Sequence, residues 1–510
     1  MLGEKNRVCK VHTAVCLEDL VPVNHFYRQV EAKLDLGFVR EMVQDRYTSQ
    51  RGRPSIDPVV FFRLQLIMFF EGIRSERQLM EQVTVNLAHR WYIGYDLDEA
   101  VPDHSSLSKI RDRYGLDIFQ RFFEAIVDRC CAAGLVWGKE LYFDGTKVRA
   151  NADIDKRIPR FYWEAQQHLQ TLFAKVEETP EPAEAPRGFV NRYNGQRLVG
   201  SRTHTTQERQ ADTFVCPTAP DATPLYSQPG HSRLGYHVHY VVDGGKAWVI
   251  LAVLVTPACI MDNTPMLDLE RWVRFRWKVH PRLAVADAKY GTLVNIVGLE
   301  QDGIRAYLAV PDPSVRTKLY SQERFQYDAQ RDGYLCPQGQ FLSLSSFDRY
   351  QQAFMYRTSP KICNVCPVKS ACTTSRYGRV VRRSLAQEYL DRVHTYRSTP
   401  AYQKALRKRS VWIEPLFGEA KQWHQLIQFR LRRLYKVNIQ ALLTAAGQNI
   451  KRLLKSQHVH KPLRTAQAVV LAVPLPLLDL SPASSCFFSR LSRCPGAFLT
   501  SPASLPVIFH

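Results

Sequence analysis

Residues 141–153 read LYFDGTKVRANAD, and this stretch decides the fold because it places an acid at the end of an apolar run. Leu141, Tyr142 and Phe143 favour a buried β-strand, and they lead directly into Asp144. A carboxylate in such a position is costly to bury unless it caps a turn or binds a cation. We therefore predict a strand that carries Asp144 into a polar turn, and both roles for the acid remain open.

A second acid stands in the same kind of position within residues 281–291, PRLAVADAKYG. The letters LAVA predict a short buried strand, and Asp287 follows at its carboxyl end. Ligands of α/β sheets collect at that edge of the sheet. Asp144 and Asp287 are therefore expected to lie side by side on neighbouring strands.

The residues around the two acids predict the rest of an α/β unit. Two apolar runs over 235–258 flank an Asp-Gly-Gly turn, which predicts an antiparallel hairpin with Asp243 as a turn residue. Residues 177–232 begin with EETPEPAEAP, which is acidic and rich in proline, and they predict a long, poorly ordered insertion. The other expected elements are helices over 156–175, over 293–299, over 438–454 and after a cap at Asn263 or Thr264, and a strand over 304–310.

The segment 26–137 has the periodicity of helices. Asp57 followed by a proline predicts a capped helix start, and Gly72 predicts the end of that helix. Ser75 and Gln78 have the spacing of a capping box, which predicts the start of a second helix.

A third expected helix opens at Asp103 and carries the first candidate DNA contacts. Leu107 and Ile110 are expected to face inward. Short helices joined by tight turns and edged with arginine suit a helix-turn-helix-like DNA-binding domain, while a helical cap on another domain is an open alternative. The side chains expected to face outward are Lys109, Arg111 and Arg113.

The composition limits the classes of function. The chain has 510 residues, 45% of them hydrophobic, so it can bury a large core and we expect two to four domains. Its formal charge of +21 indicates a polyanionic partner, and nucleic acid fits best, although a Lys- and Arg-rich solvated surface also gives this charge. No apolar run has the length of a secretory signal or a bilayer span, so we expect no membrane association and a cytoplasmic, reducing location.

Twelve cysteines in a reducing location direct attention to clusters with metal-ligand spacing. Cys336, Cys363, Cys366 and Cys372 are separated by 26, 2 and 5 residues, and the middle pair forms a CxxC. Thiolates two residues apart can both reach one tetrahedral ion, so these four are candidate ligands of a structural Zn²⁺. Four unligated cysteines are the alternative interpretation.

A third acid stands in the C-terminal region, in the letters WIEPLFGEAKQWH. Glu414 and Lys421 are seven residues apart, two helical turns, so the two side chains would share one helix face. Pro415 removes a hydrogen bond inside a helix, so we expect a kink or a fresh helix there. Arg407 and Arg409 precede this stretch and, with Lys421, are candidate DNA contacts.

These features together resemble a DDE insertion-sequence transposase of the cut-and-paste bacterial kind that carries a cysteine cluster. The resemblance covers roughly residues 26–456 and rests on Asp144, Asp287, Glu414 and Lys421. It extends to the phrases GYHVHYVVDGG, ADAKYGT, CNVCPVK and WIEPLFGEAKQWH. The wider family often places a Tyr and an Arg seven and four residues before the Glu; this chain has Arg407 and Ser410 there, so the roles of that Tyr and Arg are not carried over.

The resemblance implies a ribonuclease H-like mixed-sheet core, with Asp144 on its first strand, Asp287 after its fourth and Glu414 on a later helix. It implies DNA strand cleavage and 3′-end strand transfer at the ends of the chain's own element. The three carboxylates would bind Mg²⁺ or Mn²⁺. The implied partners are double-stranded DNA, at the terminal inverted repeats and at the target, and a second copy of the chain in a homodimer on DNA.

The composition shifts and the resemblance together give the expected domain boundaries. From Gln457 the sequence turns to Ala, Val, Leu, Pro and Ser without periodicity, which predicts an irregular or disordered tail. Two other functions remain open: a zinc-dependent DNA-binding regulator, and a ribonuclease H-like host nuclease that cuts without rejoining. The expected divisions are an extension over 1–25, a helical DNA-binding domain over 26–137, the first part of the core over 138–315, a cysteine-cluster insertion over 316–397, C-terminal catalytic helices over 398–456 and the tail over 457–510.

Overall fold

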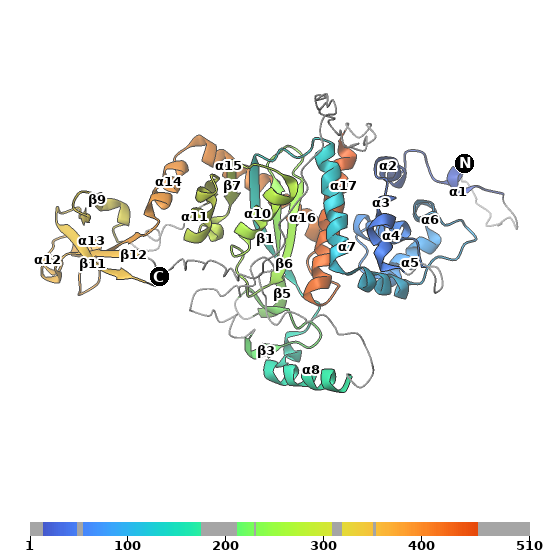
Figure 1. Ribbon diagram of the computed structural model, residues 1–510, viewed down its shortest axis with the longest axis horizontal. Coiled ribbons are helices and arrows are strands. Elements are labelled where there is room, and N and C mark those ends of the chain that lie inside the picture. The colour runs from blue at the N-terminus through green and yellow to red at the C-terminus, as the bar shows by residue number, and fades with distance from the viewer. Residues whose placement is uncertain are drawn as a thin grey trace, which may run out of the picture. The chain divides into compact units, whose positions relative to one another are not determined.

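Figure 1 shows the computed structural model of the chain. It describes residues 14–47, 55–174, 212–228, 231–308, 319–349 and 353–456, which all belong to one compact unit within residues 1–461. The predicted tail over 457–510 and residues 177–211 of the predicted insertion lie outside the described residues. The described part combines an N-terminal helical region with a mixed α/β region, as the sequence predicts. None of the helices in it has the length and apolar character needed to cross a bilayer.

Six strands form the mixed sheet that carries Asp144 and leads into Asp287. The order is β4-β5-β1-β7-β8, and β6 also pairs with β5. Strand β5 is antiparallel to β1, β4 and β6, whereas β1, β7 and β8 are mutually parallel neighbours. The strands are β1 (Glu140–Arg149), β4 (Thr223–Gln228), β5 (His231–Asp243), β6 (Ile250–Pro257), β7 (Leu283–Ala286) and β8 (Arg305–Leu308).

Strand β1 runs further than the sequence predicts. The chain stays extended to Arg149, because the residues from Gly145 onward continue the antiparallel ladder with β5 and Val148 is fully buried. The predicted polar turn after Asp144 is therefore wrong, and this acid lies inside a strand. The hairpin of β5 and β6 is confirmed, and so is the turn role of Asp243, whose carboxylate accepts hydrogen bonds from the amides of Trp137, Gly138 and Gly245.

Part of the segment expected to be poorly ordered has regular structure. Strand β3 (Phe214–Val215) pairs with β2 (Ile158–Pro159), and β4 extends the main sheet along β5. The prediction is therefore wrong for residues 212–228, because this stretch contributes apolar side chains that pack away from water. The buried ones are Val215, Cys216, Ala219, Ala222 and Leu225.

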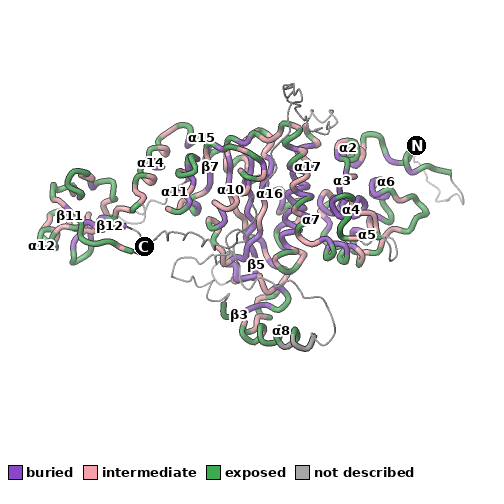
Figure 2. Tube along the Cα trace, viewed as in Figure 1, coloured by how far each residue is buried: buried purple, intermediate pink, exposed green. Residues whose placement is uncertain are grey.

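Helix α4 (Pro58–Phe70) forms the centre of the N-terminal helical region and is buried on most sides (Figure 2). Asp57 caps it by accepting a hydrogen bond from the amide of Val59, and Gly72 follows it in a left-handed conformation, with φ of 63°. Both features were predicted. The neighbouring helices are α1 (Leu17–Leu20), α2 (Phe26–Lys33), α3 (Phe38–Val43), η1 (Gln44–Arg46), α5 (Glu76–Val85), α6 (Leu87–Ile93) and α7 (His104–Ala132).

The helix caps beyond α4 follow the predictions only in part. Asp103 caps α7 as expected, through a hydrogen bond from the amide of Ser105. The Ser75 side chain makes no capping hydrogen bond, so the predicted capping box is not formed. Pro265 precedes the helix expected after Asn263, and the Asn263 side chain instead donates to a backbone carbonyl further along the chain.

Helix α17 (Leu434–Lys455) connects the helical region to the sheet. It packs along α7 and β6 and also contacts α4 and α2 (Figure 1). Two of its amide side chains bond to β6: Asn438 accepts from the Val255 amide at 2.9 Å, and Asn449 accepts from the Ile250 amide at 2.9 Å and donates to its carbonyl at 2.8 Å. These contacts satisfy backbone groups on the free side of an edge strand, which would otherwise be buried without partners.

The remaining helices of the described part lie between and after the strands of the main sheet in the chain. The helices predicted over 156–175, 293–299 and 438–454 are confirmed, and so is the strand predicted over 304–310. Thr399 caps the helix that begins at Pro400, because its side chain accepts a hydrogen bond from the amide of Tyr402. The bounds of the remaining helices are η2 (Ile154–Lys156), α8 (Arg160–Ala174), α10 (Met266–Trp277), η3 (Ala288–Tyr290), α11 (Leu293–Gln301), α14 (Gln387–Arg397), α15 (Pro400–Trp412) and α16 (Glu414–Gln422).

A second, smaller sheet lies between β8 and α14 in the chain, and it holds the predicted cysteine cluster. Its strands are all antiparallel, in the order β13-β12-β11-β10-β9. It has an apolar cluster of its own, made by Phe325, Tyr334, Leu342, Tyr356 and Val381. Its elements are η5 (Gln322–Arg324), β9 (Gln326–Asp328), β10 (Gly333–Leu335), β11 (Phe341–Asp348), β12 (Ala353–Arg357), α12 (Pro360–Asn364), α13 (Lys369–Cys372) and β13 (Val380–Ser384).

Candidate active site

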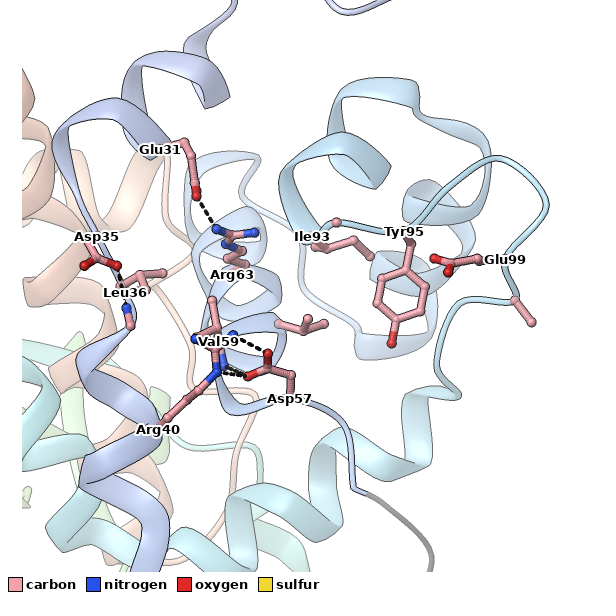
Figure 3. A pocket seen from close by; sticks show the side chains of 14 residues that line it. Glu31, Asp35, Leu36, Arg40, Asp57, Val59, Arg63, Ile93, Tyr95 and Glu99 are labelled. Atoms are coloured by element: carbon pink, nitrogen blue, oxygen red, sulfur yellow. Dashed lines mark hydrogen bonds and ion pairs between the residues drawn. The ribbon is translucent and has the colours of Figure 1, made fainter. Parts of the chain in front are cut away.

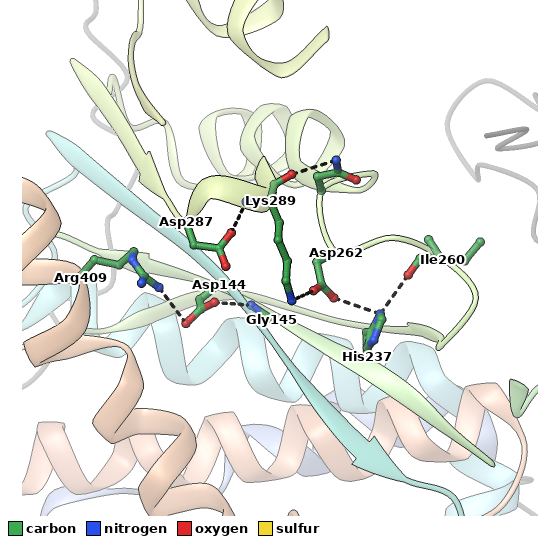
Figure 4. A network of polar contacts seen from close by, with 9 residues as sticks. Asp144, Gly145, His237, Ile260, Asp262, Asp287, Lys289 and Arg409 are labelled. Atoms are coloured by element: carbon green, nitrogen blue, oxygen red, sulfur yellow. Dashed lines mark hydrogen bonds and ion pairs between the residues drawn. The ribbon is translucent and has the colours of Figure 1, made fainter. Parts of the chain in front are cut away.

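The register of the sheet brings Asp144 and Asp287 to the same level. The parallel pairing of β1 with β7 ends at Tyr142 and Val285, and each acid follows two residues later on its own chain segment. Asp287 caps η3 by accepting a hydrogen bond from the Lys289 amide at 2.9 Å. Figure 4 shows the two acids next to each other, as we expected of strands that are parallel neighbours.

Glu414 reaches the same place from α16. Its helix begins afresh with Pro415 in the first turn, which is one of the two outcomes predicted for that proline. Arg409, near the end of α15, lies between two of the acids. One guanidinium nitrogen is 3.3 Å from Asp144 Oδ2, and the other is 3.6 Å from Glu414 Oε1. Arg409 thus links the strand-borne acid to the helical acid.

The negative charge of Asp144 is only partly balanced by the groups around it. Its side chain is only 14% exposed, and burial raises its pKa to about 6. The charges of Asp287 and Glu414 add to the rise, while Arg409 and the hydrogen bond from the Gly145 amide oppose it. The three acids therefore interact electrostatically, although they come from distant parts of the sequence.

The predicted cations differ in their relation to these acids. Lys421 lies near enough that the charge of Asp144 acts on it, while burial lowers its pKa. Arg407 and Arg113 are exposed. The prediction that Arg111 faces outward is wrong. Its side chain is only 3% exposed and forms an ion pair with Glu76 in α5. Its face of α7 packs against that helix, so helical periodicity alone misplaced it.

A polar network beside the acids was missed in the sequence (Figure 4). The amine of Lys289 lies 3.2 Å from Asp262 Oδ2, and Asp262 Oδ1 lies 3.0 Å from His237 Nδ1. Burial opposes a rise in the pKa of Lys289, but Asp262, Asp287 and Asp144 together raise it. The signal was present in the letters ADAKYG, where a lysine stands two residues after the acid.

The neighbouring Gly145 keeps this network close to β1. A Cβ atom at Gly145 would lie 3.3 Å from His239 Nδ1 and 3.4 Å from Asp262 Oδ1, which is tighter than or at the limit of ordinary packing. The Asp-Gly pair of the opening stretch therefore reflects close packing against the polar network and not a turn.

The acid site has the donor chemistry that a hard divalent cation needs. Across the described ranges, no three His, Cys, Asp or Glu side chains are close enough to hold one metal ion. Arg409 stands between Asp144 and Glu414 and supplies positive charge there. Carboxylate oxygens suit Mg²⁺ or Mn²⁺, and the raised pKa of Asp144 indicates that more positive charge would be favourable at this point.

The four predicted cysteines gather in the small sheet region. Burial raises the pKa of Cys372, and the charges of Cys363, Cys336 and Cys366 add to that rise, so all four thiols lie near one another. Every one of them is a free thiol of intermediate exposure. The cluster is therefore present, but its thiols are not at the distances of a metal site.

A cavity of about 830 Å³ lies in the N-terminal helical region, away from the acids (Figure 3). Its arginines are neutralised by neighbouring carboxylates: Arg40 lies 2.5 Å from Asp57, and Arg63 pairs with Glu31. The two arginines are therefore not free to bind an anion, and the lining also carries the carboxylates of Asp35 and Glu99.

Two family models match the chain. Residues 15–113 match the model described as "Transposase domain (DUF772)", and residues 335–454 match the one described as "Transposase DDE domain". The second match includes Glu414 and Lys421, whereas Asp144 and Asp287 lie outside both. No curated protein and no solved structure matches the chain.

On this mixed α/β fold, the two matches define an enzyme of DNA transposition. More particularly, the chain is a DDE transposase, with a DUF772 N-terminal domain and a DDE catalytic domain, and as a transposase it binds DNA. Enzymes of this class use a divalent metal.

Proposed function

We propose that Asp144, Asp287 and Glu414 are the catalytic acids of a ribonuclease H-like core, which cuts DNA at the ends of its own element and transfers the 3′ ends to target DNA. The observation that carries the proposal is geometric: Arg409 lies between Asp144 and Glu414, and Asp287 stands at the same level of the sheet as Asp144. The strand order supports the core assignment, because β1 has an antiparallel neighbour on one side and two parallel strands on the other. Asp287 follows the fifth strand of this sheet in chain order, and the fourth if the edge strand β4 is left out.

Each residue of the site has a task on the phosphodiester. The three carboxylates would hold Mg²⁺ or Mn²⁺, which neutralises charge on the reacting phosphate and activates an oxygen nucleophile. Lys421 shares a helix with Glu414 and binds a phosphate oxygen as a compact cation. Arg409 pairs with the acids in the absence of DNA and turns to a phosphate when the acids are neutralised.

The DNA contacts outside the acid site are assigned by exposure. Arg407 on α15 and Arg113 on α7 face solvent and are proposed to contact the DNA backbone. A helix-turn-helix-like role for the N-terminal helices is retained as part of this proposal. Arg111 is not assigned as a DNA contact on this ground, because its side chain is buried.

Strand cleavage of a duplex carrying the element's terminal repeat tests the acids. Asp144→Asn, Asp287→Asn and Glu414→Gln should each lower the cleavage rate by at least about a thousandfold, as is common for loss of a group that stabilises the transition state. Duplex binding should be retained. The control is Asp155→Asn, which changes an exposed acid shortly after β1 and should cleave at the wild-type rate. Cleavage at the wild-type rate by any of the three variants removes that residue from the site.

A joining assay separates transposition from simple hydrolysis. A precut end with a free 3′ hydroxyl, incubated with target duplex and Mg²⁺, should become covalently attached to the target. A host nuclease with the same acids would cut and leave the end unjoined.

For the cysteine cluster we propose a structural Zn²⁺ held by Cys336, Cys363, Cys366 and Cys372. Support comes from the gathering of all four thiols around Cys372. Metal analysis of the purified chain should give one Zn per chain, and Cys366→Ser should lower that content. Cys16→Ser is the control, because Cys16 is an exposed free cysteine in the N-terminal helical region. A zinc content near zero in the wild type contradicts the assignment.

We also propose that two copies act together on paired ends, in the cytoplasm with the element's DNA. The mass of the complex with terminal-repeat duplex, measured by light scattering, should correspond to two chains and two duplexes.

A further inference from the structure

A basic groove lies between the N-terminal helices and the sheet. It has a volume of about 490 Å³ and contains no carboxylate in its lining. Its cations come from three places: α7, the loop after α16, and the start of α17. The charged side chains that line it are Arg111, Arg430, Arg432, Arg433 and Lys436.

The loop that supplies three of these arginines is held firmly. The amides of Arg430 and Leu431 donate to Gln440 Oε1 at 3.0 and 3.3 Å. Asn151, just past β1, donates to the Arg430 carbonyl at 2.9 Å and accepts from Arg432 Nε at 3.0 Å. The backbone of the loop and the guanidinium groups of Arg430 and Arg432 are therefore held in place, so less entropy is lost when they bind a ligand.

The charges of the groove are only partly balanced. Arg111 and Arg430 share one carboxylate, that of Glu76, and Lys436 lies 2.6 Å from Asp112. Within the described part of the chain, no carboxylate pairs with Arg432 or Arg433, both of which are exposed. Between them, the five cations thus form ion pairs with only two carboxylates, and the nearby Asp221 accepts from the amide of Leu434. The groove therefore keeps an excess of positive charge.

Two of these arginines are in an unfavourable environment without a further anion. Arg111 is only 3% exposed, and its Nε atom has no hydrogen-bond partner among the described residues. Burial lowers the pKa of Arg111 to about 9 and that of Arg430 to about 10. The cavity of Figure 3 is different, because each of its arginines has its own carboxylate.

The groove lies within reach of the reacting phosphate. Asn151 lines it and follows Asp144 by seven residues of mostly extended chain, which span at most about 23 Å. DNA advances about 3.4 Å per base pair, so this length corresponds to about seven base pairs.

We infer that this groove binds the sugar-phosphate backbone of the element's end, within about seven base pairs of the cleaved bond, and so ties the N-terminal helices and the catalytic sheet to one duplex. The inference rests on the proposed function in two respects: it takes terminal-repeat DNA as the ligand, and it measures the seven-base-pair window from Asp144 as the place of cleavage. Phosphate oxygens fit the site because they accept several hydrogen bonds from guanidinium groups.

Neutral phosphate scanning tests the inference. The probe is a terminal-repeat duplex with single methylphosphonate linkages moved along the strand, and its binding to the full chain is measured in EDTA, so that no cleavage occurs. With the wild type, a neutral linkage at a contacted phosphate should weaken binding about tenfold. In each of the variants Arg432→Gln and Arg433→Gln, the loss of affinity caused by the neutral linkage should disappear at one such position. The slope of log Kd against log salt concentration should also decrease by about one in each variant.

Arg305→Gln is the matched control. This exposed arginine lines a different basic cavity, of about 520 Å³, at the amino ends of the parallel strands, so it should leave the pattern of penalties unchanged. The inference is overturned if the wild type shows no penalty in the seven-base-pair window, or if both groove variants keep every penalty. A variant that binds DNA normally but changes the mass of the complex would point to a protein interface instead, and also overturns it.

A failure of the groove and a failure of the catalytic assignment give different results. Binding in EDTA needs no reaction, so cleavage by the Asp144→Asn variant would contradict the catalytic acids and leave the phosphate pattern readable. If the neutral linkages cause no loss of affinity while cleavage still depends on the three acids, only the inference about the groove is contradicted.

Discussion

At the residue scale, Asp144 shows how one side chain depends on partners far away in the sequence. Its burial comes from β1 and β5, the like charges come from Asp287 and Glu414, and the opposing charge comes from Arg409. Because burial is the largest of these effects, the acid is destabilising in the absence of a cation. A functional site is where such a cost is expected.

Asp144→Asn should stabilise the fold at neutral pH and change it little below pH 4. The folded-state pKa of about 6 exceeds the ordinary 3.8, so the unfolded chain loses its proton first as the pH rises. The stability of the wild type should therefore decrease between these two values, by at most about 3 kcal/mol. Asn does not titrate, so the difference in unfolding free energy between variant and wild type should grow across this window. Denaturation in EDTA below and above the window measures it, and a constant difference would contradict the raised pKa.

Arg409→Gln should move the acidic limb of the cleavage profile to higher pH. Arg409 opposes the rise in the pKa of Asp144, and its loss leaves burial and the two neighbouring acids unopposed by that charge. Because Arg409 pairs with Asp144 in the absence of DNA, cleavage rates at low DNA concentration, which report the free enzyme, measure the position of the limb over a range of pH. Arg409→Lys keeps the charge, so its acidic limb should lie near that of the wild type. If the acidic limb of Arg409→Gln does not move, Arg409 does not act through Asp144.

At the element scale, α17 is the helix on which the sheet edge depends. It is buried along most of its length, and Asn438 and Asn449 bond to the free side of β6. Gly447 on the same helix allows close approach to α4, since a Cβ there would lie 2.4 Å from the Phe69 ring. Helical region and sheet therefore share one core, which agrees with their joint apolar cluster.

Asn449→Ala should lower the free energy of unfolding by about 2 to 4 kcal/mol. The change removes two hydrogen bonds and leaves the amide and carbonyl of Ile250 buried without partners. Lys455→Ala, at an exposed position of the same helix, should change stability by less than about 0.5 kcal/mol. Equilibrium denaturation of both variants measures the two changes. If Asn449→Ala is as stable as the wild type, other groups or water bond to the amide and carbonyl of Ile250.

At the scale of the whole molecule, the acid site should couple metal binding to stability. A ligand that binds only the folded state raises Tm with its concentration. Mg²⁺ should therefore raise the Tm of the wild type and have a smaller effect on Asp144→Asn and Glu414→Gln. Thermal unfolding over a Mg²⁺ titration measures this, with Asp155→Asn as the control that should behave like the wild type. Equal shifts in all four proteins would indicate metal binding elsewhere.

Much of the fold could be predicted because it depends on neighbours along the chain. The cap at Asp57, the strand before Asp287 and the fresh helix at Pro415 follow from local patterns, and all are present. The resemblance to DDE transposases was sufficient for the class of enzyme, since short phrases around the acids carry it. The assignment of the individual acids stays a prediction that the cleavage variants test.

The sequence by itself determined the helices, most strands, the order of the acids and the class of enzyme, because periodicity, caps and motifs are local properties. Only the tertiary structure decided that β1 continues past Asp144, that Arg409 lies between two acids and that Arg111 is buried against Glu76. Each of these depends on which element packs beside the residue, and that choice is made by contacts between segments that are distant along the chain or lie on different helices. The polar character of Gly145 to Lys147 looked like a turn for the same reason: the β5 strand that pairs with it lies about ninety residues later in the chain.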